Sequence, residues 1–267
     1  MRIIRYLAQT GNIQFASEQP DGRCFDICGD LFRSFEVTDR EAAMVKLLAP
    51  IEPRVMLCIG LNYRKHAEEQ GSQLPAYPLL FVKSPNSLQN PGYPITIPTK
   101  LRSDEVDYEG ELAVVIGREC KNVRKENALD YVFGYTAAND VSARDWQKKL
   151  GGGQFCRGKS FDTFAPLGPA IVTKDEIPDP STLNISTRVN GETRQDSNTG
   201  DMIFDVPTLI EFLSGSTTIL PGTIILTGTP AGVGMAMNPP RFLVPGDIIE
   251  IQIEKIGILS NPVIIEE

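Results

Sequence analysis

Short apolar runs recur along most of the chain, and their residue types indicate β-strands rather than helices. They are rich in β-branched and other apolar residues, and turn-forming pairs separate them. The runs are residues 55–60 (VMLCIG), 111–117 (ELAVVIG), 133–139 (FGYTAAN), 169–173 (PAIVT), 183–189 (LNISTRV), 223–228 (TIILTG) and 248–254 (IIEIQIE). The clearest turn signals are Asn190-Gly191, Pro221-Gly222 and Pro245-Gly246. An Asn-Gly pair between two such runs is a strong hairpin signal.

Helical patterns are few and short, at residues 126–132, 142–150 and 206–213. Since strands and helices do not alternate regularly, the pattern argues against a doubly wound sheet or a TIM barrel. Residues 68–92 are polar at first and then rich in Pro, Gly and Ser, which predicts a long loop of the kind that forms lids. The predicted fold class is mainly β with some α, in the form of a β-rich roll or distorted barrel.

The first fifty residues have the pattern of a small α+β segment. Short strands are predicted at residues 2–8 and 13–16, and a turn at residues 20–22. A helix is predicted over residues 38–48, because Thr38 and Glu41 have the spacing of a capping box and Pro50 closes the segment. We therefore expect an N-terminal segment of residues 1–52 and a main domain of residues 53–267.

Charge and cysteine content narrow the classes of function. The 267 residues include 26 Lys and Arg against 34 Asp and Glu, a net charge of −8, so neither nucleic acid nor an anionic membrane is an expected partner. The cysteines number 5 and are irregularly spaced, which predicts free thiols in a reducing compartment rather than disulfides or a zinc site. The opening residues lack the apolar core of a signal peptide, and no stretch approaches the roughly 20 apolar residues of a membrane span. We expect a cytoplasmic protein.

Two glutamates stand at the head of the apolar run 111–117. Glu109 and Glu111 are two residues apart, so in a strand their side chains project from the same face. A strand end can simply place such acids in water, but Asp140 follows the run 133–139 and supplies a third carboxylate. Three converging carboxylates would repel one another unless a cation lay between them, and an all-oxygen set suits Mg²⁺, with Mn²⁺ or Ca²⁺ as alternatives. Convergence itself does not follow from these residues alone.

A set of motifs occurs in an order that resembles the fumarylacetoacetate hydrolase family. The motifs are EVDYEGELAVVIG (105–117), NDVSARDWQ (139–147), RGKSFDTFAPLGP (157–169), VNGETRQDSNTGDMIF (189–204) and ILTGTPAGVG (225–234). The resemblance covers roughly residues 53 to 265 and implies a mixed β-roll in which Glu109, Glu111 and Asp140 hold magnesium. The N-terminal segment is much shorter than that of the family's namesake. The chain resembles instead the shorter branch that acts on acylpyruvates, oxaloacetate and related dioic acids, and the family resemblance also implies a homodimer.

His66 is the only histidine in the chain, and Glu69 follows three residues later. If this stretch forms a helical turn, the two side chains share a face and can pair, although Glu68 is an adjacent alternative partner. A lone histidine is usually a surface or packed residue. In the resembling family, the positions that match His66 and Glu69 form an acid–base dyad on a mobile lid, so this pair is the predicted general acid–base.

The family resemblance implies functions for four further residues. Lys159 is by residue type most often a solvated lysine, but the matching position lies beside the metal, where its charge would stabilise an enolate. Arg144 and Gln147 match positions that could bind the substrate carboxylate or order the water shell. The run 227–234 (TGTPAGVG) lacks the ending of a phosphate-binding loop and needs no function as a turn, whereas the resemblance implies that Thr229 contacts an anionic end of the substrate.

Taken together, these residues predict an enzyme that uses a divalent cation to stabilise an enolate made from a small 2-oxo acid. Hydrolysis of a carbon–carbon bond in an acylpyruvate-type 2-oxo acid is placed slightly ahead, with water activated by His66 and Glu69. Tautomerisation or decarboxylation of oxaloacetate is the alternative, because the same electron sink serves each reaction. A different class of function is a binding protein that has kept the fold and lost the chemistry, and the presence of every motif residue argues against it.

Overall fold

The computed structural model describes residues 1–267, and strands form most of its regular structure. The strands are β1 (Arg2–Ala8), β2 (Ile13–Glu18), β3 (Cys24–Asp30), β4 (Ser34–Glu41), β5 (Met44–Leu48), β6 (Met56–Gly60), β7 (Leu79–Lys83), β8 (Leu88–Gln89), β9 (Ile95–Ile97), β10 (Val106–Asp107), β11 (Gly110–Ile116), β12 (Val132–Asn139), β13 (Ser142–Ala143), β14 (Ala165–Thr173), β15 (Asn184–Val189), β16 (Glu192–Asn198), β17 (Ile224–Leu226), β18 (Ile248–Ile253) and β19 (Gly257–Ile265). The α-helices are α1 (Arg64–Glu69), α2 (Arg144–Lys148), α3 (Phe155–Lys159) and α4 (Val206–Ser214). Short 3₁₀ helices are η1 (Pro85–Ser87), η2 (Lys125–Tyr131), η3 (Leu150–Gly152), η4 (Thr199–Asp201) and η5 (Gly234–Ala236).

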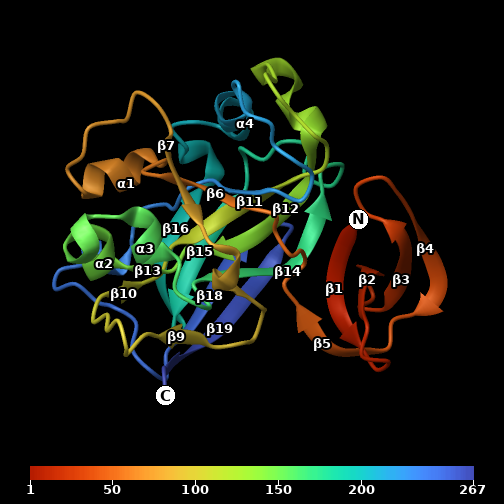
Figure 1. The fold of residues 1–267 in the computed structure, drawn as a ribbon, viewed down its shortest axis with the longest axis horizontal. Helices are drawn as coiled ribbons and strands as arrows, with labels where there is room; N and C mark the ends of the chain where they lie inside the picture. Colours follow the sequence, from red (N-terminus) through yellow and green to blue (C-terminus); the bar gives the residue numbers. More distant parts are fainter.

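The strands form two large sheets and one short ladder (Figure 1). The 12-stranded sheet has the order β4-β3-β2-β1-β14-β12-β11-β17-β6-β7, with β5 paired to β1 and β8 paired to β14. The 5-stranded sheet has the order β16-β15-β18-β19-β9, and β10 pairs with β13. Both large sheets are open, so the predicted mixed β-roll is confirmed and no closed barrel is formed.

β11 lies at the centre of the larger sheet, between β12 and β17. All 7 of its residues are buried, because apolar side chains cover both of its faces. Leu112 and Val114 belong to the larger core cluster together with Ile251 of β18, whereas Ala113 and Val115 belong to a second cluster on the opposite face. A strand covered on both sides holds any polar residue within it away from water.

The N-terminal segment is entirely β, so the helix predicted over residues 38–48 and the α+β character of this segment are wrong. β4 pairs with β3, and β5 pairs with β1. Thr38 donates its hydroxyl to the Asp26 carbonyl oxygen at 3.0 Å instead of capping a helix. Residues 38–48 include good helix formers, but strand pairing overrides a local propensity worth less than about 1 kcal/mol per residue.

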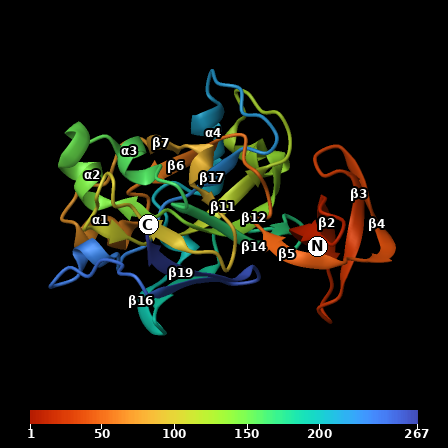
Figure 2. The same cartoon turned by 60° about the horizontal axis from the view of Figure 1, so that its bottom comes forward.

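Residues 1–52 are built onto the edge of the larger sheet. β1 pairs with β14 through Arg2 opposite Val172 and Ile3 opposite Ile171. Figure 2 shows β2, β3 and β4 at one end of the molecule, beyond β14. The boundary at residue 52 stays a prediction.

Most other predicted elements are present with altered limits. Each of the seven apolar runs contains a strand, and α4 confirms the helix predicted at residues 206–213, with the Asp205 carboxylate capping the Thr208 amide at 2.9 Å. The helix predicted at residues 126–132 is the 3₁₀ helix η2. The helix predicted at residues 142–150 is limited to α2, because Ser142 and Ala143 pair with β10 instead.

The long loop predicted at residues 68–92 is wrong for much of its length. β7 lies within it and pairs with β6 from Leu79 opposite Gly60 to Lys83 opposite Met56. The prolines that flank this run, Pro78 and Pro85, concealed a strand of 5 residues. Only residues 70–78 connect α1 to β7 without helix or strand. None of the helices has the length and apolar character that crossing a membrane requires.

Candidate metal centre and active site

The pairing of β11 with β12 brings the three predicted metal ligands together. Gly110 lies opposite Asn139 in the antiparallel register, so Glu109 and Asp140 meet where the two strands end, and the Asp140 amide donates to the Glu109 carbonyl oxygen at 2.9 Å. Glu111 lies two residues along β11 and projects from the same face as Glu109. Ligand oxygens from Glu109, Glu111 and Asp140 all lie within 4.8 Å of one another.

The electrostatics of this cluster fit a bound cation. Burial raises the pKa of Glu111 well above its usual range, and the charges of Asp140 and Glu109 raise it further. The Gly228 amide donates to Glu111 Oε2 at 2.7 Å, which is too little to offset them. A hard divalent ion among the three carboxylates would remove this repulsion, and an oxygen-only donor set is the kind that such ions prefer. The residues present therefore fit a divalent metal.

Two buried lysines, Lys159 and Lys83, donate hydrogen bonds to the carboxylates of this cluster. Lys159, at the end of α3, donates to Glu109 Oε2 at 2.8 Å and to Asp140 Oδ2 at 2.6 Å. Lys83, at the end of β7, donates to Asp140 Oδ1 at 2.7 Å. Burial opposes the charge of both, and it lowers the pKa of Lys83, whereas Asp140 and Glu109 raise the pKa of Lys159 despite burial. Asp140 therefore bridges the two lysines, with one carboxylate oxygen bound to each.

Arg144 and Gln147 of α2 lie beside Glu109. Arg144 donates to Glu109 Oε1 at 2.5 Å, to Gln147 Oε1 at 3.1 Å and, through Nε, to Asp107 Oδ2 at 2.9 Å. Burial alone would raise the pKa of Glu109, but Lys159 and Arg144 hold it well below its usual range. Arg144 Nη2 is buried and lies 2.9 Å from Asp107 Oδ2, so this nitrogen is part of an ion pair. The guanidinium therefore joins Glu109, a predicted metal ligand, to Asp107.

The predicted acid–base pair is present on α1. His66 Nδ1 lies 2.6 Å from Glu69 Oε1, and both Glu69 oxygens accept from the Gly232 amide, at 3.2 and 3.0 Å. Glu69 rather than Glu68 is the partner of His66. Gly232 has φ +101, and a Cβ there would meet the Arg194 carbonyl oxygen at 2.1 Å, so only glycine permits this approach.

The first part of the predicted lid is anchored more firmly than the sequence indicated. Asn62 is fully buried, and its side-chain amide donates to the carbonyl oxygens of Phe204 and Thr227 at 3.0 and 2.7 Å. Tyr63 and Ala67 are also fully buried. The part of the lid that precedes and carries His66 is therefore anchored in the core through Asn62, Tyr63 and Ala67. Mobility of the lid stays a prediction.

Thr229 lies at the edge of the cavity, and its hydroxyl is already engaged. It donates to the Gly110 carbonyl oxygen at 3.0 Å and accepts from Gln195 Nε2 at 2.8 Å. Gln195 also accepts from the Gly110 amide at 3.0 Å through Oε1. The pair therefore braces the start of β11, between Glu109 and Glu111.

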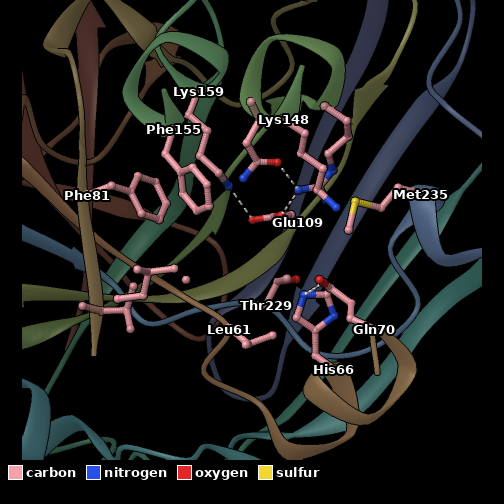
Figure 3. Close-up of a pocket in the computed structure, with 15 residues that line it drawn as sticks. Leu61, His66, Gln70, Phe81, Glu109, Lys148, Phe155, Lys159, Thr229 and Met235 are labelled. Carbon is pink, nitrogen blue, oxygen red and sulfur yellow. Dashed lines mark hydrogen bonds and ion pairs between the residues drawn. The ribbon is translucent and has the colours of Figure 1, made fainter. Parts of the chain in front are cut away.

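These side chains surround one cavity of about 150 Å³. Figure 3 shows Lys159 and Phe155 on one side of it, His66 with Gln70 on the opposite side, and Glu109 between them. Predicted site residues that line the cavity are His66, Glu109, Arg144, Gln147, Lys159 and Thr229. Glu111 and Asp140 lie behind it and are 1% and 0% exposed. Apolar side chains of Leu79, Phe81 and Met235 complete the wall.

Five polar residues of the site were missed in the sequence, among them Lys148, which lines the cavity. Asp107 is fully buried, binds Arg144 and accepts from the amides of Gly234 and Met235 at 2.8 and 3.1 Å. Asp107 and Gln195 lie inside the motifs quoted above, which could have identified them. Lys83 ends the apolar run 79–83, which was taken for loop. Gln70 lies four residues after His66, a spacing that places two side chains on one face of a helical turn and that could have identified it.

This β-roll protein combines a buried carboxylate cluster that could bind a cation with a histidine–carboxylate pair on the opposite side of a small cavity. These are the parts that a metal-dependent enzyme requires. Residues 55–264 match the family model described as fumarylacetoacetate (FAA) hydrolase C-terminal. The chain belongs to the fumarylacetoacetate hydrolase family.

Several relatives are close to this chain. It is 51% identical over 221 residues to "Oxaloacetate tautomerase fahd2, mitochondrial" of Xenopus laevis, covering 82% of this chain and 69% of the relative. It is 46% identical over 221 residues to "Oxaloacetate tautomerase FAHD2A, mitochondrial" of Homo sapiens, covering 82% and 70%. A solved structure of 5-carboxymethyl-2-hydroxymuconate delta-isomerase from Mycobacterium smegmatis superposes with a TM-score of 0.87, 40% identity and full coverage of both chains. The two named tautomerases are mitochondrial, in contrast to the cytoplasmic location expected here from the sequence.

Proposed function

We propose that this protein interconverts the keto and enol forms of oxaloacetate in a reaction that depends on a divalent cation. The observation that carries the proposal is the position of the His66–Glu69 pair across a compact cavity from Glu109 and Lys159. The sequence placed hydrolysis of an acylpyruvate first. The names of relatives that are 51% and 46% identical favour tautomerisation instead.

The acid–base step requires one proton to move between carbon and oxygen of the substrate. From the keto form, His66 Nε2 takes a proton from carbon 3. The electron pair of the broken C–H bond forms the double bond between carbons 2 and 3, and the negative charge moves to the 2-oxo oxygen. Return of the proton to that oxygen gives the enol, and the reverse sequence gives the keto form. Glu69 stabilises the ring while it carries the extra proton, because its carboxylate accepts from Nδ1.

The negative charge that develops on the substrate is stabilised by the opposite side of the cavity. A divalent cation held by Glu109, Glu111 and Asp140 would supply electrostatic stabilisation there, and Mg²⁺ is the proposed ion, with Mn²⁺ or Ca²⁺ as alternatives. The ammonium group of Lys159 has three N–H donors and uses two of them for carboxylates. Its third donor is available to the oxygen that gains charge.

The remaining polar residues of the cavity suit a dicarboxylate. The proposed roles of Arg144, Gln147 and Thr229 in binding substrate rest on their position in the cavity wall. Lys148 also lines the cavity and has no carboxylate partner, whereas Lys149 pairs with Glu105 at 2.9 Å. Burial lowers the pKa of Lys148, and the charge of Arg144 lowers it further. A second substrate carboxylate would compensate that charge.

The test is turnover of enol oxaloacetate, followed by its ultraviolet absorbance, with Mg²⁺ and after removal of metal by a chelator. We expect Mg²⁺-dependent decay well above the solution rate, with little release of pyruvate or carbon dioxide. Acetylpyruvate in the same assay reports hydrolysis. Cleavage of acetylpyruvate without tautomerisation would restore the hydrolase interpretation, release of carbon dioxide would favour a decarboxylase, and no turnover of any oxo acid would favour a binding protein.

We also propose that the protein is a homodimer. Support comes from β7, which is an edge strand of the larger sheet and exposes Leu80 (46%) and Val82 (40%). Unpaired strand edges with apolar side chains are typical contact surfaces. Light scattering should give twice the mass of one chain. Leu80→Glu should halve that mass, whereas Leu220→Glu, at a position elsewhere that is 40% exposed, should not. A monomeric parent protein would contradict the proposal.

A further inference from the structure

Both ring nitrogens of His66 have a partner at the end of α1: Glu69 is its last residue, and Gln70 is the C-cap that follows. Glu69 Oε1 lies 2.6 Å from Nδ1. The Gln70 amide nitrogen lies 2.7 Å from Nε2, and Figure 3 shows Gln70 beside the ring of His66. A carboxylate can only accept a hydrogen bond and an amide nitrogen can only donate one. The arrangement is therefore that of a neutral ring with its proton on Nδ1 and its lone pair on Nε2. If the amide were turned over, its oxygen would face Nε2 and the ring would have to be doubly protonated.

The nitrogen that Gln70 covers is the one that the proposed reaction uses. With Nδ1 committed to Glu69, Nε2 is the only ring position able to receive a proton from substrate or from water. His66 is 4% exposed, and the cavity beside it is only about 150 Å³, so a water on Nε2 and the Gln70 amide compete for the same place. In this arrangement the Gln70 amide, rather than a water molecule, lies against Nε2 of His66.

We infer that Gln70 is a positioning residue that holds His66 ready for proton transfer and keeps a hydrolytic water off Nε2. The inference rests on the proposed tautomerase function. Tautomerisation moves one proton within a single substrate, so the substrate needs only to displace one amide. Hydrolysis adds the hydrogen and hydroxyl of a water across a carbon–carbon bond, so it needs a water on Nε2 together with the substrate. Gln70 therefore selects between two reactions that the same cavity can otherwise support.

The hydrogen bonds of the His66 ring can be tested by NMR of a ¹⁵N-histidine sample, which requires neither metal nor turnover. Because the chain contains a single histidine, the sample gives one set of ring nitrogen signals. We expect a protonated Nδ1 and an unprotonated Nε2 whose signal is shifted by a hydrogen bond. Gln70→Leu should move the Nε2 signal and leave Nδ1 in place, whereas Glu69→Gln should move Nδ1. The matched control is Gln73→Leu, because Gln73 is exposed in the same connection. An Nε2 signal that is identical in Gln70→Leu and the parent would overturn the placement of Gln70.

The choice of reaction is tested by the ratio of acetylpyruvate hydrolysis to oxaloacetate tautomerisation. Gln70→Ala removes the amide and opens space for water, so we expect the ratio to rise about tenfold, a part of the 10²- to 10⁴-fold that a positioned base contributes. Gln70→Leu also lacks the amide but keeps the space filled, so its ratio should stay near that of the parent. Gln73→Ala should match the parent in both rates. Equal ratios in Gln70→Ala and the parent, or an equal rise in Gln70→Leu, would overturn the inference.

The two proposals fail in different ways. A parent protein that does not tautomerise oxaloacetate contradicts the proposed function, while the ring nitrogen signals still decide whether Gln70 holds Nε2. Conversely, efficient tautomerisation by the parent together with an unmoved Nε2 signal in Gln70→Leu would keep the proposed function and exclude the role of Gln70. Circular dichroism and thermal melts of each variant establish that it is folded.

Discussion

The three metal-site carboxylates lie on or beside central strands of a large sheet, whereas the histidine–carboxylate pair lies on a helix of 6 residues outside it. Every residue of β11 is buried, and the pairing of β11 with β12 sets where Glu109 and Asp140 meet. By contrast, α1 begins without a side-chain cap, and its own buried residues are only His66 and Ala67. It is held by the buried residues Asn62 and Tyr63 that precede it and by the contact of Glu69 with Gly232. The two sides of the cavity therefore have independent structural support.

This difference predicts that cation binding and proton transfer can be removed separately. Changes on the sheet side should abolish both cation binding and catalysis, because the charge of the cluster depends on each carboxylate. Changes on the helix side should remove proton transfer alone. Stability should also respond differently, since an uncompensated buried charge destabilises a protein more than the loss of a contact near its surface.

The largest effect is expected for Asp140→Ala. The change removes one of three ligands and leaves both Lys83 and Lys159 without their shared carboxylate. Divalent cation binding, measured by calorimetry on metal-free protein, should be lost, and tautomerisation should fall to the solution rate. Asp130→Ala, at an exposed position, is the control. Unchanged cation affinity or full activity in Asp140→Ala would contradict the assignment of the metal site.

The next effect in size is expected for His66→Ala. Tautomerisation should fall by roughly 10²- to 10⁴-fold, the usual contribution of a positioned acid–base group. Oxalate and Mg²⁺ should bind as tightly as they do to the parent, because the three carboxylates do not depend on α1. Glu69→Gln should lower the rate in the same direction by a smaller factor. If all rates are unchanged in His66→Ala, the histidine has no part in catalysis.

The sequence was sufficient for elements whose signal is local, and insufficient where distant strands decide the outcome. The apolar run 111–117 and the helix at residues 206–213 carry their own periodicity and caps, so both were predicted. Residues 38–48 and 79–83 become strands because β1, β3 and β6 pair with them, and such long-range pairing leaves no local pattern. The prolines beside residues 79–83 then pointed to a loop.

The candidate site shows the same division. Glu109 and Glu111 could be placed on one face of a strand from their spacing alone, but their approach to Asp140 depends on the register of β11 with β12. The resemblance to a family supplied that convergence. Lys83 reaches Asp140 from a strand that the sequence did not reveal. Gln70 has the i,i+4 spacing to His66, but that spacing alone does not show which ring nitrogen its amide faces.

A smaller effect is expected on stability when Glu111 is changed to Gln in metal-free protein. Burial, Asp140 and Glu109 raise the pKa of Glu111, so the folded state binds its proton more tightly than the unfolded state. The folded protein therefore loses stability as pH rises above the ordinary glutamate value of about 4.3 and through the raised pKa. Above that range Glu111→Gln should be more stable than the parent by about 1–2 kcal/mol, and near pH 4 the difference should shrink. Denaturant unfolding in the presence of a chelator, near pH 4 and again above the raised pKa of Glu111, measures this difference in stability. Added Mg²⁺ should stabilise only the parent. An identical pH dependence in both proteins would contradict the argument.

The smallest effect concerns the rim of the cavity, where Lys148 lines the wall without a carboxylate partner and Lys149 pairs with Glu105. If Lys148 binds the second carboxylate of oxaloacetate, Lys148→Met should raise KM about fivefold, since a partly exposed ion pair contributes no more than about 1 kcal/mol. The value of kcat should change little, because the proposed reaction takes place between His66 and Lys159 and the Lys148 contact is the same in substrate and transition state.

Oxalate, which has no distal group, should bind Lys148→Met and the parent equally. Lys149→Met carries the same change of charge one residue away and should leave KM near the parent value, and raised salt should reduce the difference between parent and Lys148→Met. Equal KM values for Lys148→Met and Lys149→Met would show that the effect is one of overall charge, and would contradict a specific contact between Lys148 and the distal carboxylate.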